Sequence, residues 1–242
     1  LANEQTLRLA AFGGILLVMG IWELLSPRRV AVFSKVRRWI TNLSLSILNS
    51  LLLRFLLPVL AVGAASWAQG NEIGLFNQLA LPVLLECILA LLLLDLAIYA
   101  QHVLFHHVPV FWRLHKVHHA DPEIDCSTGI RFHPVEILLS MAIKLGLVTA
   151  LGVAPITIIV FEVLLNGTSL FNHGNVRLPL FIDGLLRRVI VTPDMHRVHH
   201  STVIEETNSN FGFNLSVWDR VFGTYKAQPK KGHLAMERSE ER

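Results

Sequence analysis

Long apolar runs constrain this chain more than any other feature. A transmembrane helix needs about 20 consecutive, largely apolar residues, and five runs approach or exceed that length: Leu9–Leu25, Leu43–Ala68, Leu79–Ala100, Val135–Leu151 and Ile156–Leu170. The second and third are long enough to span, whereas the first is marginal because it is short and holds Glu23 near its end. Only 16% of the residues are charged and 52% are hydrophobic, against about 25% charged in a soluble domain. This composition argues against a soluble globular enzyme, excludes a disordered chain, and predicts an all-α integral membrane protein.

The last two runs form a predicted helical hairpin. Residues 152–155 (Gly-Val-Ala-Pro) separate them, and a Gly/Pro break between two apolar arms indicates a tight turn. Each arm has 15–17 residues, so the pair either re-enters the membrane or spans a thinned bilayer. The five runs together predict about four transmembrane helices or helical-hairpin arms.

Basic residues near the helix ends predict the orientation. The connection after the first run is rich in them, and the connection around residues 69–72 has none. Cytoplasmic connections carry the excess of Lys and Arg, so we expect the first connection, the end of the third run and both ends of the hairpin on the cytoplasmic side. The residues after the hairpin hold no comparable apolar run and predict a cytoplasmic helical cap that carries the metal site described below. The basic residues concerned are Arg28, Arg29, Lys35, Arg37 and Arg38.

No Pro/Gly/Ser-rich linker divides the chain, which predicts a single membrane domain over residues 1–242. Within it, residues 1–78 supply N-terminal helices, residues 79–225 carry the clustered histidines, and residues 226–242 form a charged tail. The membrane expected is the plasma or inner membrane in a bacterium and the endoplasmic reticulum in a eukaryote.

Histidine is distributed very unevenly. Eleven of the twelve lie between His102 and His200, and the first 101 residues have none. Residues three or four apart share a helix face, so one HxxxH and two HxxHH motifs each gather imidazoles. Imidazole is the commonest metal ligand and suits iron and zinc alike, and eight imidazoles exceed what one tetrahedral zinc can use. One HxxHH can arise by chance, but the three motifs together predict two metal ions, with the ligands His102, His106, His115, His118, His119, His196, His199 and His200.

Four further histidines lie outside these motifs. His133 opens the hairpin and His173 closes it, so both are placed to complete the metal set. His133 could equally support a ligand or begin a helix. His107 lies off the face shared by its neighbours and is predicted not to be a ligand, and His233, in the charged tail, is predicted to be solvated.

Asp95 is a carboxylate inside an apolar run, which is costly and therefore functional by default. The spacing puts Asp95, Tyr99, His102 and His106 on one helical stripe. We expect catalytic roles for Asp95 and Tyr99, with Asp95 orienting a ligand imidazole through its second ring nitrogen. The alternative for Asp95 is a hydrogen bond between helices.

Other charges inside the apolar runs have a simpler interpretation. Glu86 and Arg54 could form an ion pair between two runs. Lys144 and Glu162 lie one in each arm of the hairpin and could do the same.

The three histidine motifs, in this order, resemble those of the fatty acid hydroxylase/sterol desaturase superfamily. The resemblance extends to residues 218–225 (WDRVFGTY), to residues 192–201 (TPDMHRVHHS), and to the His133-Pro134 and Asn172-His173-Gly174-Asn175 elements. It covers roughly residues 90–225, and the combination of motifs is highly specific.

The resemblance implies a di-iron, oxygen-dependent membrane enzyme that hydroxylates or desaturates a C–H position of a sterol or fatty acyl lipid. It implies that the eight motif histidines are ligands of two iron ions, and that His173 matches the family's isolated histidine. Molecular oxygen is the implied co-substrate. Because the chain has no fused haem or flavin domain, electrons are expected from a separate donor protein.

The chemistry of the residues agrees with an iron enzyme. Cleavage of an unactivated C–H bond requires a redox-active metal, which zinc is not, although zinc could replace iron in a purified sample. Two other classes stay open: a zinc-dependent membrane hydrolase and a non-catalytic metal-binding membrane protein. Basic residues are scattered, so nucleic acid is not an expected partner. The sequence does not choose between hydroxylation and desaturation.

Overall fold

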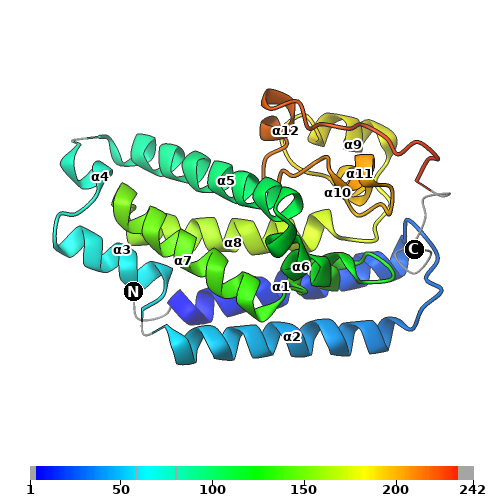
Figure 1. Cartoon of the computed structure of the whole chain (residues 1–242), viewed down its shortest axis with the longest axis horizontal. Coiled ribbons are helices and arrows are strands. Elements are labelled where there is room, and N and C mark those ends of the chain that lie inside the picture. Colours follow the sequence, from blue (N-terminus) through cyan, green and yellow to red (C-terminus); the bar gives the residue numbers. More distant parts are fainter. Residues whose placement is uncertain (1–3, 58, 80, 234–242) are drawn as a thin grey trace.

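The computed structural model is all-helical over the residues it describes, which are 4–57, 59–79 and 81–233 (Figure 1). In these ranges the extended contacts are two isolated bridges, Pro27–Val176 and Ile190–Leu215. The helices are α1 (Glu4–Leu25), α2 (Lys35–Leu56), α3 (Ala61–Gly70), α4 (Leu75–Gln78), α5 (Val83–His107), α6 (Pro109–His119), the 3₁₀ helix η1 (Cys126–Ile130), α7 (Pro134–Leu151), α8 (Pro155–Asn172), α9 (Leu180–Leu186), α10 (Pro193–His199), α11 (Ile204–Thr207) and α12 (Val217–Val221).

Five helical segments of the described chain are long and apolar enough to cross a membrane, which confirms the predicted class. They are Glu4–Leu25, Lys35–Gln78, Val83–His107, Pro134–Leu151 and Pro155–Asn172. The first is therefore longer than the marginal run that the sequence indicates.

The second predicted run, Leu43–Ala68, which Arg54 and Pro58 interrupt in the sequence, is divided between two helices. Helix α2 ends at Leu56, and α3 begins at Ala61. Leu57 is extended, with φ −116° and ψ 107°, because a residue that precedes a proline is disfavoured in the helical region.

The predicted hairpin is confirmed. Helix α7 ends at Leu151 and α8 begins at Pro155, which occupies the first helical position, where a missing N–H costs nothing. Gly152 ends α7 in the left-handed conformation, with φ +68°. Glu86 accepts a hydrogen bond from the Ala154 amide (3.3 Å), so this carboxylate caps the hairpin turn, while Arg54 is exposed.

An ion-pair cluster joins three membrane helices. The Lys144 ammonium on α7 lies 3.1 Å from the Glu162 carboxylate on α8, as the sequence suggests, and Arg8 of α1 pairs with the same carboxylate. A charge inside a membrane is costly unless it finds a partner. These pairs therefore connect α1, α7 and α8.

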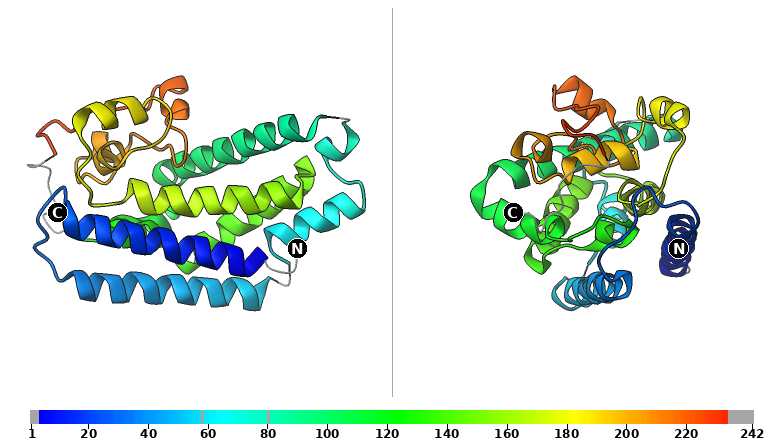
Figure 2. Two further views of the ribbon diagram at one scale, coloured as in Figure 1. Left: turned by 180° about the vertical axis from the view of Figure 1, so that it is seen from behind. Right: turned by 90° about the vertical axis from the view of Figure 1, so that its right-hand side faces the viewer.

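The long helices run side by side, and the short helices α9–α12 gather at one end of them (Figure 1). The views from behind and from the end show this cap covering one side of the bundle (Figure 2). The C-terminal ends of α5 and α8 and the start of α7 reach the same region. The histidine motifs are therefore brought to one end of the bundle, whose side of the membrane stays a prediction.

We predict that Gly152→Ala destabilises the hairpin. A Cβ there would lie 2.6 Å from Asn77 Nδ2 and 2.7 Å from the Ile73 carbonyl, in a conformation that costs a non-glycine residue roughly 1–2 kcal/mol by itself. The matched control is Gly146→Ala in α7, where a Cβ meets nothing within 4 Å and helix propensity favours alanine by about 1 kcal/mol. Thermal unfolding in detergent should give a lower Tm for the first and an equal or higher Tm for the second. Equal Tm values would contradict the turn's importance.

Candidate metal centre

Nine histidines converge in two groups, each able to place its ligand atoms within 4.8 Å of one another. The two groups adjoin, because the rings of His119 and His200 stack with centroids 4.4 Å apart and those of His115 and His118 lie 5.1 Å apart. The first group is His102, His106, His115, His119 and His199, and the second is His118, His173, His196 and His200.

Each HxxHH motif is divided between the two groups. His115 and His119 join the first group and His118 the second, while His196 and His200 join the second group and His199 the first. The two histidines four residues apart point the same way along the helix, and the remaining one is rotated away from them. One motif thus supplies ligands to two adjacent sites, which spacing alone did not reveal.

Most of these imidazoles are oriented through Nδ1. His102, His118, His173 and His199 each place Nδ1 2.8–3.1 Å from a backbone carbonyl, of Phe211, Arg131, Ser169 and Ser209 respectively. His106 Nδ1 lies 3.3 Å from the Asn208 side-chain oxygen. A carbonyl only accepts, so Nδ1 carries the proton and Nε2 keeps its lone pair.

Nε2 lone pairs consequently face one another in two contacts, His102 with His115 (3.1 Å) and His118 with His173 (3.0 Å). The Nε2 atom of His196 also lies 3.1 Å from that of His173. The buried Nε2 atoms of His106, His119, His199 and His200 have no hydrogen-bond partner. Facing lone pairs in a buried site repel, and a bound cation removes the repulsion. The donor set therefore fits metal ions.

Burial keeps these rings neutral. It holds the pKa of His118, His119 and His199 well below the usual histidine range, with neighbouring imidazoles adding to the effect. The pKa of His173 falls to about 3, mainly through burial. A metal ligand must be deprotonated, so the fold prepares these side chains for binding at neutral pH.

Glu136 is a site residue that the sequence analysis missed. Its Oε1 lies 2.7 Å from His115 Nδ1, and both side chains are buried. A carboxylate on the far nitrogen fixes the ring and raises its basicity as a ligand. The signal was its place in the first turn of the hairpin arm, two residues after Pro134.

The other histidines lie away from the two groups. The His133 side chain accepts a hydrogen bond from the Val135 amide and caps the N-terminus of α7, which matches the helix-start alternative. His107 is exposed, and its Nδ1 faces the Val103 carbonyl.

The prediction that His233 is solvated is wrong: the side chain is buried, with its Nε2 3.8 Å from the Asp194 carboxylate. Residues 234–242 of the predicted tail lie outside the described residues.

The four residues of the predicted stripe all lie on α5. The hydrogen-bond partners of Asp95, however, are not the ligand imidazole that the sequence predicts. Its carboxylate accepts hydrogen bonds from the amides of Asn214 and Leu215 and, at 2.8 Å, from the Trp218 indole. Tyr99 bonds to the Thr224 hydroxyl at 2.9 Å. Both residues hold the C-terminal segment, residues 208–225, against α5. Positioning of this segment accounts for their contacts better than a role at the metals.

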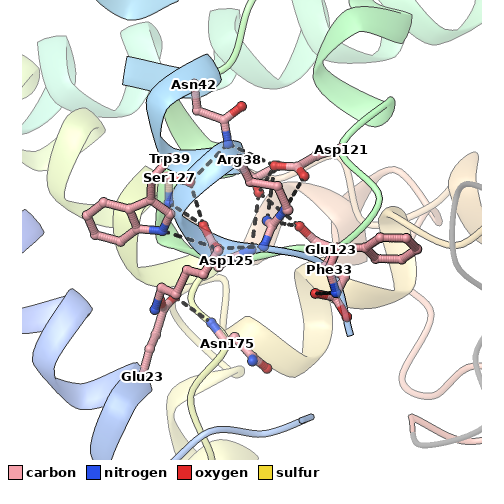
Figure 3. A network of polar contacts seen from close by, with 12 residues as sticks. Glu23, Phe33, Arg38, Trp39, Asn42, Asp121, Glu123, Asp125, Ser127 and Asn175 are labelled. Carbon is pink, nitrogen blue, oxygen red and sulfur yellow. Dashed lines mark hydrogen bonds and ion pairs between the residues drawn. The ribbon is translucent and has the colours of Figure 1, made fainter. Parts of the chain in front are cut away.

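A buried polar network supports the second group from α1 and α2 (Figure 3). The Arg38 guanidinium donates to Asp121 (2.6 Å) and to Asp125 (2.8 Å). Asn42 donates to Asp121 and Ser127, and its oxygen accepts from Arg131, whose carbonyl faces His118. Burial alone would raise the pKa of Asp121, but the bond and charge of Arg38, together with hydrogen bonds from Asn42 and Thr128, outweigh it and lower that pKa. The network fixes the loop between α6 and α7.

The chain belongs to the fatty acid hydroxylase family, which matches residues 87–224. It is 31% identical over 150 residues to ornithine lipid hydroxylase OlsE of Rhizobium tropici, covering 62% of this chain and 44% of that protein. It is 31% identical to human alkylglycerol monooxygenase, covering 59% of this chain and 31% of that protein. Cholesterol 25-hydroxylase of Rattus norvegicus is 30% identical over 82% of this chain and 65% of its own length. The chain thus spans less than two thirds of each relative, and no solved structure matches it.

We predict that Glu136→Gln weakens metal binding by about 10–100-fold, the usual effect of losing such a ligand partner. The amide keeps the size of the side chain and can still accept from His115, so the loss isolates the charge. Metal content after titration with a chelator measures the effect. The control is Glu205→Gln, whose side chain is exposed. Unchanged retention of metal in Glu136→Gln would contradict its assigned role.

We also predict that Asp95→Asn loosens residues 208–225. Hydrogen bonds to a charged group contribute about 1.5–3 kcal/mol, so amide hydrogen exchange in this segment should accelerate roughly tenfold or more. The control is Glu86→Gln, which changes a carboxylate at the opposite end of α5. Loss of metal with unchanged exchange would instead favour the direct contact with an imidazole expected from the sequence.

Proposed function

We propose that this protein is an oxygen-dependent hydroxylase of a lipid C–H position, with one iron ion held by each histidine group. The observation that carries the proposal is the pair of adjoining, buried, all-imidazole groups at the end of membrane helices. Neutral nitrogen ligands suit iron and leave the ions highly charged, hence electrophilic. Iron, when bound, would supply the redox chemistry that activates oxygen.

The protein's own residues hold and shield this chemistry. Backbone carbonyls and Glu136 keep the Nδ1 protons of the rings that they contact in place, so that the Nε2 atoms of these rings face the centre. The cap and the buried polar network exclude bulk water, which suppresses side reactions. A site at the membrane end lets an acyl or sterol tail stay in lipid while its reacting carbon reaches the centre.

Hydroxylation is proposed rather than desaturation because all three relatives named above are hydroxylases or monooxygenases by name. The reaction inserts one oxygen atom of O₂ into a C–H bond and reduces the other to water, with two electrons and two protons. A separate electron-donor protein is proposed to supply the electrons. We propose that the centre lies on the cytoplasmic side, because the α1–α2 connection is rich in basic residues. Of these, Arg28 and Arg38 also bind Asp194 and Asp121.

The test combines metal loading with lipid analysis. Cells that express the protein should accumulate a lipid with one added oxygen atom, which carries the isotope when labelled O₂ is supplied. A hydrolase would instead give cleaved lipid with oxygen from water and activity with zinc. A binding protein would give no lipid product. Either result would overturn the proposal.

We predict that His118→Ala and His199→Ala, one from each group, abolish this product while the protein still inserts into the membrane. Each removes one ligand of its site and leaves the apolar helices unchanged. Metal analysis should fall from close to two ions per chain toward one. The matched control is His107→Ala, an exposed α5 histidine, which should keep both metal and product. Turnover above about a tenth of the wild-type value in the first two variants would contradict the assignment. Such turnover corresponds to an increase of less than ~1.4 kcal/mol in the activation free energy.

A further inference from the structure

Helices α9 and α12 bury charged side chains and expose apolar ones, which is the reverse of the arrangement expected at a surface in water. Asp183 on α9 and Arg187, the residue that follows the helix, are buried and pair with each other, while Leu180, Phe181 and Leu185 of α9 are exposed. A helix at a water surface does the reverse, burying its apolar stripe and exposing its charges. The charged side of α9 is therefore used to hold the helix onto the protein, and its apolar side is turned outward.

Helix α12 repeats this arrangement. Asp219 is completely buried and accepts hydrogen bonds from the Phe211 and Gly212 amides. Val221 and Phe222 point outward. The two helices adjoin, because the Ser216 amide donates to the Val189 carbonyl and Arg220 donates to the Arg187 carbonyl. Their outward side chains form one surface, the cap apolar face: Leu180, Phe181, Leu185, Val189, Val221 and Phe222, each between 55% and 81% exposed.

Contacts with α5 set the depth of this face. The apolar part of α5 runs from Val83 to Ala100, and Trp218 at the start of α12 binds Asp95, five residues inside that end. At 1.5 Å per residue this is about 7–8 Å toward the middle of the helix. Phe222 stacks on Tyr99, with centroids 5.4 Å apart. Helix α12 therefore lies beside the membrane-spanning part of α5 and not beyond it.

The cap apolar face lies beside α5, one of the helices long and apolar enough to cross a membrane. In Figure 1, α12 and α9 follow α5 along the same edge of the molecule and overlap in length with the ends of α1 and α2. Helix α5 also exposes apolar side chains, among them Leu84 and Ile88 in its first turns. Arg177 and Arg188 are exposed beside α9, where guanidinium groups can reach lipid phosphates.

We propose that α9 and α12 rest in the lipid bilayer interface, with the cap apolar face among the acyl chains. A soluble surface does not expose a contiguous apolar patch of this kind without a partner, and apolar helices that lie in the interface insert to about 5–10 Å, which agrees with the depth set by Trp218. The proposal rests on the membrane helices and not on the proposed reaction.

The test places a fluorescent label on single cysteines in lipid vesicles. Phe181→Cys and Val221→Cys report the cap apolar face, and Ile204→Cys on α11 is the matched control. Ile204 is equally apolar and 74% exposed, but it adjoins the exposed Glu205–Lys230 ion pair, as expected of a surface in water. The background is Cys87→Ser, because the second cysteine, Cys126, is completely buried. The background without an added cysteine gives the blank.

Phosphatidylcholine brominated on its acyl chains should quench the labels at 181 and 221 about threefold more than the label at 204, and aqueous iodide should show the opposite order. Metal content confirms that each variant is folded, and no turnover is needed. Equal quenching by brominated lipid at all three positions would overturn the proposal. Shielding of 181 and 221 from both quenchers would also overturn it, because a protein partner or a second copy would then cover the face.

Discussion

The structure depends on burying nine imidazoles at one end of an apolar bundle. A buried polar group is tolerated only when it is hydrogen-bonded, and an imidazole has two nitrogens to satisfy. Backbone carbonyls, Asn208 or Glu136 face the Nδ1 atoms of six rings, while the Nε2 atoms converge on each other. The acceptors come from segments far apart in the chain, so the cap, the α6–α7 loop and the helix ends must all meet for the histidines to be buried.

The charges around this centre serve the same assembly. Arg38 joins α2 to the loop after α6, and Arg28 joins the α1–α2 connection to Asp194 beside the last histidine motif. Glu23 accepts from the amides of Cys126 and Asn175, so α1 holds the segments that follow both α6 and α8. Breaking a buried pair leaves an uncompensated charge, which makes these contacts strong constraints on the position of the ligands.

Much of this organisation could be predicted from the sequence, because apolar length, the Gly/Pro break and histidine spacing are local features. The hairpin and eight of the nine converging histidines follow from them; His173 is expected together with His133 from their places at the ends of the hairpin, and of these two only His173 joins a group. The division of each HxxHH motif between two groups could not be predicted, because it depends on where the opposing helices place their own rings. The partners of Asp95 lie more than a hundred residues away, and the burial of His233 depends on Asp194. Such long-range contacts leave no periodic signal along the chain.

One segment joins the metal centre to the membrane. Residues 208–225 supply the acceptors for His102, His106 and His199, and the same residues carry α12 and its apolar side chains. Asp95 and Tyr99 attach this segment to α5 from inside the membrane-spanning length. The position of α12 in the lipid therefore influences the position of the carbonyl oxygens that orient three ligands of the first group, because only a short stretch of backbone separates them. Helix α5 carries two of the ligands, His102 and His106, and also Asp95 and Tyr99, which hold the cap. The same helix therefore positions both the metal centre and the cap.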